Sequence, residues 1–105
     1  MANGDYCYNN LISDGKKITA VIDWGESRYG DFVLDLAWLD FWKSEVNYGD
    51  ILKVGYKNKD KDFKNYEKRF RCYKIFIGIT SIVIAAKHDD QKDYILVKND
   101  IDLFI

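Results

Sequence analysis

Proline is absent from this sequence, and cysteine and histidine are nearly so. Only two cysteines and one histidine occur among the 105 residues. Cys7 and Cys72 lie far apart and form no Cys-x-x-Cys pair, which argues against a disulfide scaffold and against a zinc site. A reducing compartment is therefore expected, and the predicted location is cytoplasmic.

An excess of charge of one sign is also lacking. The 16 Lys and Arg residues are balanced by 17 Asp and Glu residues, and the formal net charge is −1. Because no basic excess is available to hold a phosphate backbone, nucleic acid is not an expected partner. The mild acidic balance fits a cationic small molecule, although this signal is weak.

No hydrophobic run is long enough to suggest a membrane segment. The longest, residues 75–86, reads IFIGITSIVIAA and is shorter than the roughly 20 residues that span a bilayer. The N-terminus is polar and shows no signal peptide. We therefore expect no membrane partner, and we predict that this run is a buried helix.

The composition is that of a folded domain, with 48% hydrophobic, 16% aromatic and 31% charged residues. We predict a single domain over residues 1–105, of the α+β class but mostly α-helical. Residues 1–30 read as a loop and a β-hairpin, because the β-rich runs NLIS and ITAVI flank DGKK, whose Asp-Gly pair favours a tight turn. Residues 31–105 read as a helical subdomain.

The helical part begins with a wide apolar stripe in GDFVLDLAWLDFW, where Asp31 stands at the expected N-cap. A long helix, or two abutting ones, is predicted over residues 63–87. Apolar residues occupy almost every face of its second half, which predicts burial on several sides. The segment 93–105 reads as a last helix. The segment 47–62 is ambiguous: a short helix at its start is one alternative, and its end, KNKDKD, is expected to be solvated.

Three polar residues of the first part form the pattern that carries chemistry. Asp5 and Asn10 are five residues apart in one loop, and Asp23 follows the hydrophobic strand ITAVI. The hairpin between them should bring Asp23 back beside Asn10. A carboxylate that orients an attacking hydroxyl, with an amide and a second carboxylate as hard oxygen ligands for Mg²⁺, is the arrangement that phosphoryl transfer in kinases requires.

The run NGDYCYNNLI…ITAVIDWGESRYGDFVLDLAWL resembles the C-terminal lobe of the aminoglycoside phosphotransferase family, and looks closest to its hygromycin phosphotransferase branch. Family members carry His-Gly-Asp, four variable residues and Asn, then a hairpin and Ile-Asp-Trp. A Gly-Asp and an Asp-Leu-Ala helix follow. The resemblance covers about the first forty residues and implies the C-terminal lobe of a protein-kinase-like fold: catalytic loop, hairpin and helical bundle.

The resemblance implies a role for each matching residue. Asp5 would be the catalytic Asp, and Asn10 and Asp23 would hold Mg²⁺ on the phosphates of ATP. Asn3 and Asp31 would support the catalytic loop, although Asn3 replaces the family's His. Asp35 is expected to be structural. The family's acceptors are small molecules with a free hydroxyl, and the residues that would bind the acceptor stay undetermined.

Other kinase parts are not found in the sequence. No G-x-G-x-x-G loop occurs, and no strand lysine precedes the catalytic loop, so the N-terminal ATP lobe is expected to be absent. Mg²⁺ and ATP belong to the complete enzyme, and this chain by itself is expected to bind them poorly or not at all. Without its usual neighbours, the apolar helix 72–86 is expected to mediate self-association.

Two hypotheses stay open at this point. In the first, the chain is the C-terminal part of an aminoglycoside-type phosphotransferase, inactive by itself. In the second, it is a non-catalytic helical remnant that serves as an oligomerisation or interaction module.

Overall fold

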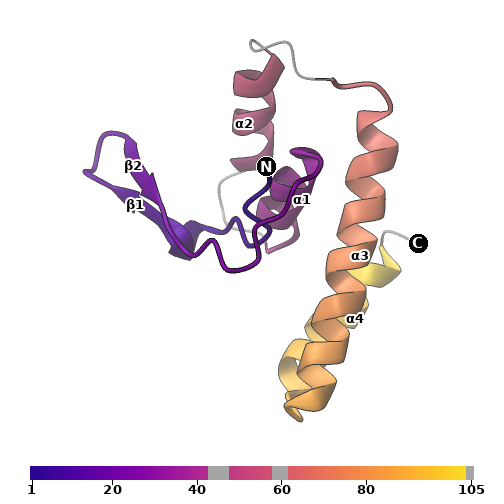
Figure 1. The fold of residues 1–105 in the computed structure, drawn as a ribbon. Coiled ribbons are helices and arrows are strands. Elements are labelled where there is room, and N and C mark those ends of the chain that lie inside the picture. Colours follow the sequence, from indigo (N-terminus) through magenta and orange to yellow (C-terminus); the bar gives the residue numbers. More distant parts are fainter. Residues whose placement is uncertain (43–47, 58–61, 104–105) are drawn as a thin grey trace.

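The computed structural model describes residues 1–42, 48–57 and 62–103. The chain runs through a short 3-10 helix η1 (Tyr8–Asn10), strands β1 (Leu11–Ser13) and β2 (Ile18–Val21), and helices α1 (Val33–Phe41), α2 (Tyr48–Lys57), α3 (Tyr66–Lys87) and α4 (Gln91–Asp102). The hairpin extends to one side of α1, whereas α3 and α4 run side by side on the other (Figure 1). The α+β, mostly helical prediction is therefore confirmed.

The hairpin forms where it was predicted. β1 and β2 pair antiparallel, with Leu11 opposite Val21 and an irregularity in register between Ile12 and Ser13. In the turn, the carboxylate of Asp14 accepts hydrogen bonds from the backbone N–H groups of Lys16 and Lys17 at 2.9 and 3.0 Å. The side chains of this hairpin are mostly exposed, so backbone pairing rather than a core holds it.

Helix α1 is the centre of the packing. Val33, Leu36 and Ala37 have no exposed surface, because α2 covers one side of the helix and α3 the other. One core cluster is shared by three helices and the N-terminus. It consists of Ala2, of Leu34, Ala37 and Phe41 in α1, of Ile77 in α3, and of Val97 and Ile101 in α4. The N-terminal end of the chain, which leads into the loop of residues 3–10, is thus anchored in the helical core through Ala2.

Helices α3 and α4 meet closely at Gly78. A β-carbon at this position would lie 2.4 Å from Cγ1 of Ile101, so only glycine permits this approach. α4 begins at a true N-cap, because the carboxylate of Asp90 accepts from the backbone N–H of Asp93 at 3.0 Å. The predicted last helix therefore begins two residues earlier than expected, and its final residues 104–105 lie outside the described part.

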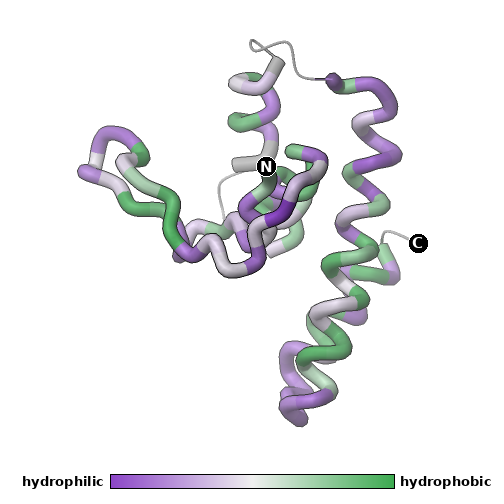
Figure 2. The backbone as a smooth tube through the Cα atoms, in the orientation of Figure 1, coloured by the Kyte–Doolittle hydropathy of each residue, from purple (hydrophilic) through white to green (hydrophobic). Residues whose placement is uncertain are grey.

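The prediction that the second half of α3 is buried on several sides is wrong. Ile77, Gly78 and Ala85 are buried, but Phe76 and Ile79 are 47% and 55% exposed. The reason is that α1 and α4 both pack against one side of the helix. The tube coloured by hydropathy shows the apolar residues of α3 gathered in its lower half, alongside α4 (Figure 2). Among the described residues, no helix has the length and hydropathy to cross a membrane.

Candidate functional site

The loop that carries Asp5 folds back on itself so that Asp5 and Asn10 are in direct contact. The Nδ2 group of Asn10 donates to the backbone oxygen of Asp5 at 3.0 Å and to its Oδ2 at 3.2 Å. The turn of η1 between them produces this approach, since Asn10 N–H donates to the Cys7 carbonyl. These hydrogen bonds fix the Asp5 carboxylate and direct the Asn10 amide oxygen away from it.

Asn3 joins the loop to the segment after the hairpin. Its side chain is buried, its Oδ1 accepts from the backbone N–H of Asp5 at 3.1 Å, and its Nδ2 donates to the backbone oxygen of Asp23 at 3.2 Å. The side chain of Asn3 thus bridges Asp5 and Asp23, two of the three residues singled out from the sequence. An amide can do this because it carries a donor and an acceptor at once.

Asp23 lies just beyond β2 in a left-handed backbone conformation, with φ of 59°. This region is uncommon for residues other than glycine, and residues held there often lie at functional sites. The neighbouring Ile22 donates its N–H to the backbone oxygen of Asn10 at 2.9 Å, so the end of β2 returns to the loop of residues 3–10, as the predicted hairpin implies. The Asp23 side chain is exposed.

The oxygen donors of this region suit Mg²⁺. Within the described residues, no group of three or more His, Cys, Asp or Glu side chains forms a metal cluster. Mg²⁺ is commonly held by one or two protein oxygens, with water and substrate phosphates completing its shell. The amide oxygen of Asn10 and the exposed carboxylate of Asp23 are donors of this kind.

Gly4 makes the close approach of two segments possible. Its φ is 83°, and a β-carbon there would lie 2.3 Å from the backbone oxygen of Glu26. Beside it, Ala2 and Arg28 exchange two backbone hydrogen bonds of 2.9 and 3.1 Å. Backbone hydrogen bonds and close packing therefore join the N-terminal loop of residues 2–10 to the segment after Asp23, in addition to the bridge through Asn3.

The carboxylate that holds the loop on α1 is that of Asp35. Its Oδ2 accepts from the backbone N–H of Asn3 at 2.9 Å and its Oδ1 from that of Gly4 at 3.0 Å. Asp35 is 8% exposed, and burial raises the pKa of its carboxyl although both hydrogen bonds lower it. Sequence reasoning assigned Asp35 only a structural part; the signal was an acid in an otherwise apolar helical face.

Asp31 is placed differently from what its predicted loop-support role implies. Its carboxylate accepts from Nε and Nη2 of Arg69 on α3 at 2.7 and 2.6 Å, and from the backbone N–H of Val33 at 3.1 Å. Burial raises the pKa of Asp31, but the Arg69 and Val33 hydrogen bonds outweigh it and the pKa lies below its ordinary value. Asp31 therefore ties α1 to α3, and the described hydrogen bonds to the loop backbone come from Asp35.

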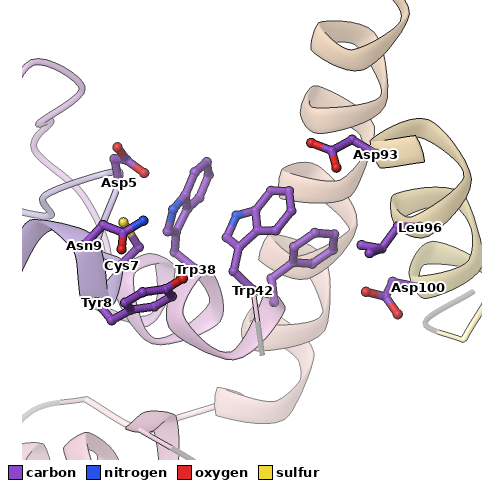
Figure 3. A pocket seen from close by; sticks show the side chains of 10 residues that line it. Asp5, Cys7, Tyr8, Asn9, Trp38, Trp42, Asp93, Leu96 and Asp100 are labelled. Carbon is purple, nitrogen blue, oxygen red and sulfur yellow. The ribbon is translucent and has the colours of Figure 1, made fainter. Parts of the chain in front are cut away.

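A cavity of about 700 Å³ opens between the loop of residues 3–10 and α4. Asp5, Cys7, Tyr8 and Asn9 line it on the loop side, and Asp93, Leu96 and Asp100 line it on α4. Trp38 and Trp42, at the end of α1, stand between these two walls (Figure 3). The cavity combines aromatic faces with acids and has Asp5 on its rim, which suits a polar cationic molecule.

The acids of α4 were not identified from the sequence. Asp93, Leu96 and Asp100 follow a spacing of three and four, which places them on one face of the helix. That periodicity was visible, but nothing in the sequence indicated that this face lies opposite Asp5.

Comparisons with known proteins give the family of this chain. The model described as "Phosphotransferase enzyme family" matches residues 4–67, which take in most of the loop of residues 3–10, the hairpin, α1 and α2. Hygromycin-B 4-O-kinase of Escherichia coli is 40% identical over 93 residues, which are 86% of this chain and 27% of that protein. This chain therefore spans little more than a quarter of the length of its curated relative. No solved structure gives a significant match.

Proposed function

Because the chain belongs to the phosphotransferase enzyme family, we propose that it supplies the catalytic loop of an ATP-dependent small-molecule kinase. The reaction is transfer of the γ-phosphoryl group of ATP to a hydroxyl of an aminoglycoside-like acceptor. The observation that carries this proposal is the hydrogen-bonded group of Asp5, Asn10 and Asn3, to which the backbone of Asp23 is tied.

Asp5 acts on the acceptor. Its carboxylate accepts a hydrogen bond from the acceptor hydroxyl, orients the oxygen toward phosphorus and takes the proton as the new O–P bond forms. The bond from the γ-phosphorus to the bridging oxygen breaks, and ADP leaves with that electron pair. Asn10 and Asn3 fix the carboxylate and its backbone, so little reorganisation is needed during the reaction.

Asn10 and Asp23 are the residues that would hold Mg²⁺ on the ATP phosphates, where the ion neutralises negative charge. Asn10 adds no charge of its own. Asp23 is held by its backbone hydrogen bond to Asn3. Because the 105 residues contain no G-x-G-x-x-G loop, we propose that the isolated chain binds Mg-ATP weakly and needs donor-binding elements from further polypeptide.

The acceptor occupies the cavity between the loop and α4. Asp93 and Asp100 pair with its ammonium groups, and Trp38 and Trp42 pack against its ring faces, so a hydroxyl can reach Asp5. An amine-bearing acceptor is supported by these acids and by the relative named as a kinase of hygromycin B.

The test is complementation in trans. The chain is mixed with the part of hygromycin-B 4-O-kinase outside the matched region, and acceptor-dependent ADP release is measured. Asp5→Asn should abolish release, and Asp93→Asn or Asp100→Asn should raise KM for the acceptor more than KM for ATP. Asp102→Asn, an exposed acid of α4 that does not line the cavity, is the matched control. Equal activity of Asp5→Asn and Asp102→Asn would contradict the proposal.

One observation favours the non-catalytic alternative as a second candidate. Apolar side chains on the free side of α3 are about half exposed, as an interaction surface requires. A chain that associates with a partner through α3, and stays inactive in every complementation, would support the role of an interaction module.

A further inference from the structure

An uncharged stripe runs along the side of α3 that faces away from the core, and we name it the α3 stripe: Cys72, Phe76, Ile79, Val83 and Ala86. At its edge, Phe76 also lines a cavity of about 330 Å³ together with Asp5 and Glu26. All five residues are exposed, Phe76, Ile79 and Val83 by 47%, 55% and 46%. Successive members are separated by four, three, four and three residues. This is the alternation of a coiled-coil seam, in which each side chain inserts between those of a facing helix.

The spacing of the stripe favours a helix as the occupant. A second helix places its own side chains at the same intervals, so they can insert between those of the stripe. The side chains of an extended strand or a flat sheet are spaced differently. Helix α3 itself carries a sequence that is complementary to the α3 stripe.

The residues of the α3 stripe complement one another when two copies run antiparallel. With Ile79 of one copy facing Val83 of the other, the large Phe76 faces the small Ala86, and this pairing occurs twice about the two-fold axis. A parallel pair would place Phe76 against Phe76 and Ala86 against Ala86. Alternation of large and small side chains across a seam fills space better than pairing like with like.

Charge and dipole favour the same direction. Lys68 is exposed on the turn before Cys72, and Asp89 and Asp90 are exposed just after α3 ends. In the antiparallel pair the start of α3 in one copy lies beside the end of α3 in the other, which brings Lys68 to the same end of the pair as the turn that carries Asp89 and Asp90. Antiparallel helices also set opposite ends of their dipoles side by side.

We propose that the α3 stripe binds the α3 stripe of a second copy of this chain in an antiparallel, two-fold helix pair. The pairing is tested separately from the phosphotransferase proposal, since no residue of the α3 stripe is given a role in phosphoryl transfer or in holding the acceptor.

The first test is the oligomeric state of the full chain. Light scattering after size exclusion, over loading concentrations from about 1 to 100 µM, should show a concentration-dependent dimer. Ile79→Glu places two carboxylates in the centre of the seam and should leave a monomer. Ile95→Glu on α4 is the matched control, since Ile95 is 57% exposed but lies off the stripe, and it should dimerise like the parent. A parent chain that stays monomeric, or an Ile79→Glu variant that still dimerises, would overturn the proposal.

The second test reads the direction of pairing and does not depend on how Ile79→Glu folds. In a background of Cys7→Ser and Cys72→Ser, Ile79→Cys and Val83→Cys chains are oxidised separately and mixed. The antiparallel pair predicts a disulfide-linked dimer only from the mixture. Dimers from each chain alone would indicate parallel pairing, since equivalent positions are then opposed.

The native Cys72 gives an independent check. In the antiparallel pair the two Cys72 residues are separated by about 27 Å along the helices, so Cys7→Ser chains should not cross-link on mild oxidation. A monomer whose α3 stripe becomes protected from hydrogen exchange only when the remainder of hygromycin-B 4-O-kinase is added would assign the stripe to that polypeptide instead, and would also overturn the proposal.

Discussion

Asp31 and Asp35 stand four residues apart at the start of α1, yet they attach different parts of the molecule. Asp35 is buried and accepts from two backbone N–H groups of the loop that carries Asp5. Asp31 is partly exposed and pairs with the guanidinium of Arg69 on α3. The loop is therefore attached to α1 by buried hydrogen bonds from neutral backbone N–H groups to Asp35. Helix α3 is attached by a partly exposed ion pair between Asp31 and Arg69. The two attachments should respond differently to substitution and to pH.

The largest effect is expected where the loop has no freedom to move. Gly4→Ala places a β-carbon against the Glu26 carbonyl at a positive φ, which should lower the free energy of unfolding by at least about 3 kcal/mol. Gly55→Ala in α2 is the control, since nothing lies near its added methyl and it should be neutral or stabilising. Urea denaturation of both variants measures the difference. Similar midpoints would mean that the loop is not packed against the Glu26 segment as described.

Removing the buried acceptor should come next in size. Asp35→Ala leaves the N–H groups of Asn3 and Gly4 without their partner, and should cost about 3 kcal/mol. The loss should be local, so amide hydrogen exchange should rise in residues 3–10 more than in α3 and α4. Uniform exchange across the chain would show instead that Asp35 supports the whole fold equally.

Asp31→Ala should cost less, about 1 kcal/mol, although it breaks a two-point ion pair. The pair is partly exposed, and Arg69 keeps its hydrogen bonds to the carbonyls of Asp62 and Lys64 at 2.9 and 2.8 Å. Urea midpoints in low and high salt provide the measurement. A loss equal to that of Asp35→Ala would remove the distinction between the two attachments.

The smallest effect is the pH dependence, and its sign differs between the two acids. The pKa of Asp31 is lowered in the folded chain, so its contribution to stability is present above the unfolded pKa and is lost as pH falls through the folded pKa. The pKa of Asp35 is raised, so its contribution is complete below the unfolded pKa and decreases as pH rises through the folded pKa. Unfolding free energies of Asp31→Asn and Asp35→Asn from pH 3 to about pH 7 should diverge from the parent in opposite directions. If the unfolding free energies of both variants changed with pH in the same direction relative to the parent, the opposite pKa shifts of the two acids would be contradicted.

The sequence was most informative where local chemistry decides the structure. The Asp14–Gly15 turn, the return of the hairpin to Asn10 and the approach of Asn10 to Asp5 follow from residue type and spacing. The role of Asp35 could not be read in this way, because its partners are 31 and 32 residues away and are backbone groups of no particular residue type.

The exposure of α3 shows the same limit. The apolar residues of a helix predict that part of its surface is buried. How many other helices cover it depends on the tertiary packing, which the local sequence does not show. α1 and α4 cover only one side, so Phe76 and Ile79 are left at the surface. The cavity acids Asp93 and Asp100 were missed for a related reason, since only the packing of α4 near α1 brings them opposite Asp5.

The most direct test of the central claim, that Asp35 sets the catalytic loop whereas Asp31 holds the helices, is the rate of phosphoryl transfer in the complemented enzyme. Initial rates of acceptor-dependent ADP release are measured for Asp35→Asn and Asp31→Asn at a temperature at which circular dichroism shows both to be folded. We predict that Asp35→Asn lowers kcat at least about tenfold with little change in KM, and that Asp31→Asn leaves kcat within about twofold of the parent. Equal kcat values for the two variants, or a larger loss for Asp31→Asn, would contradict the account.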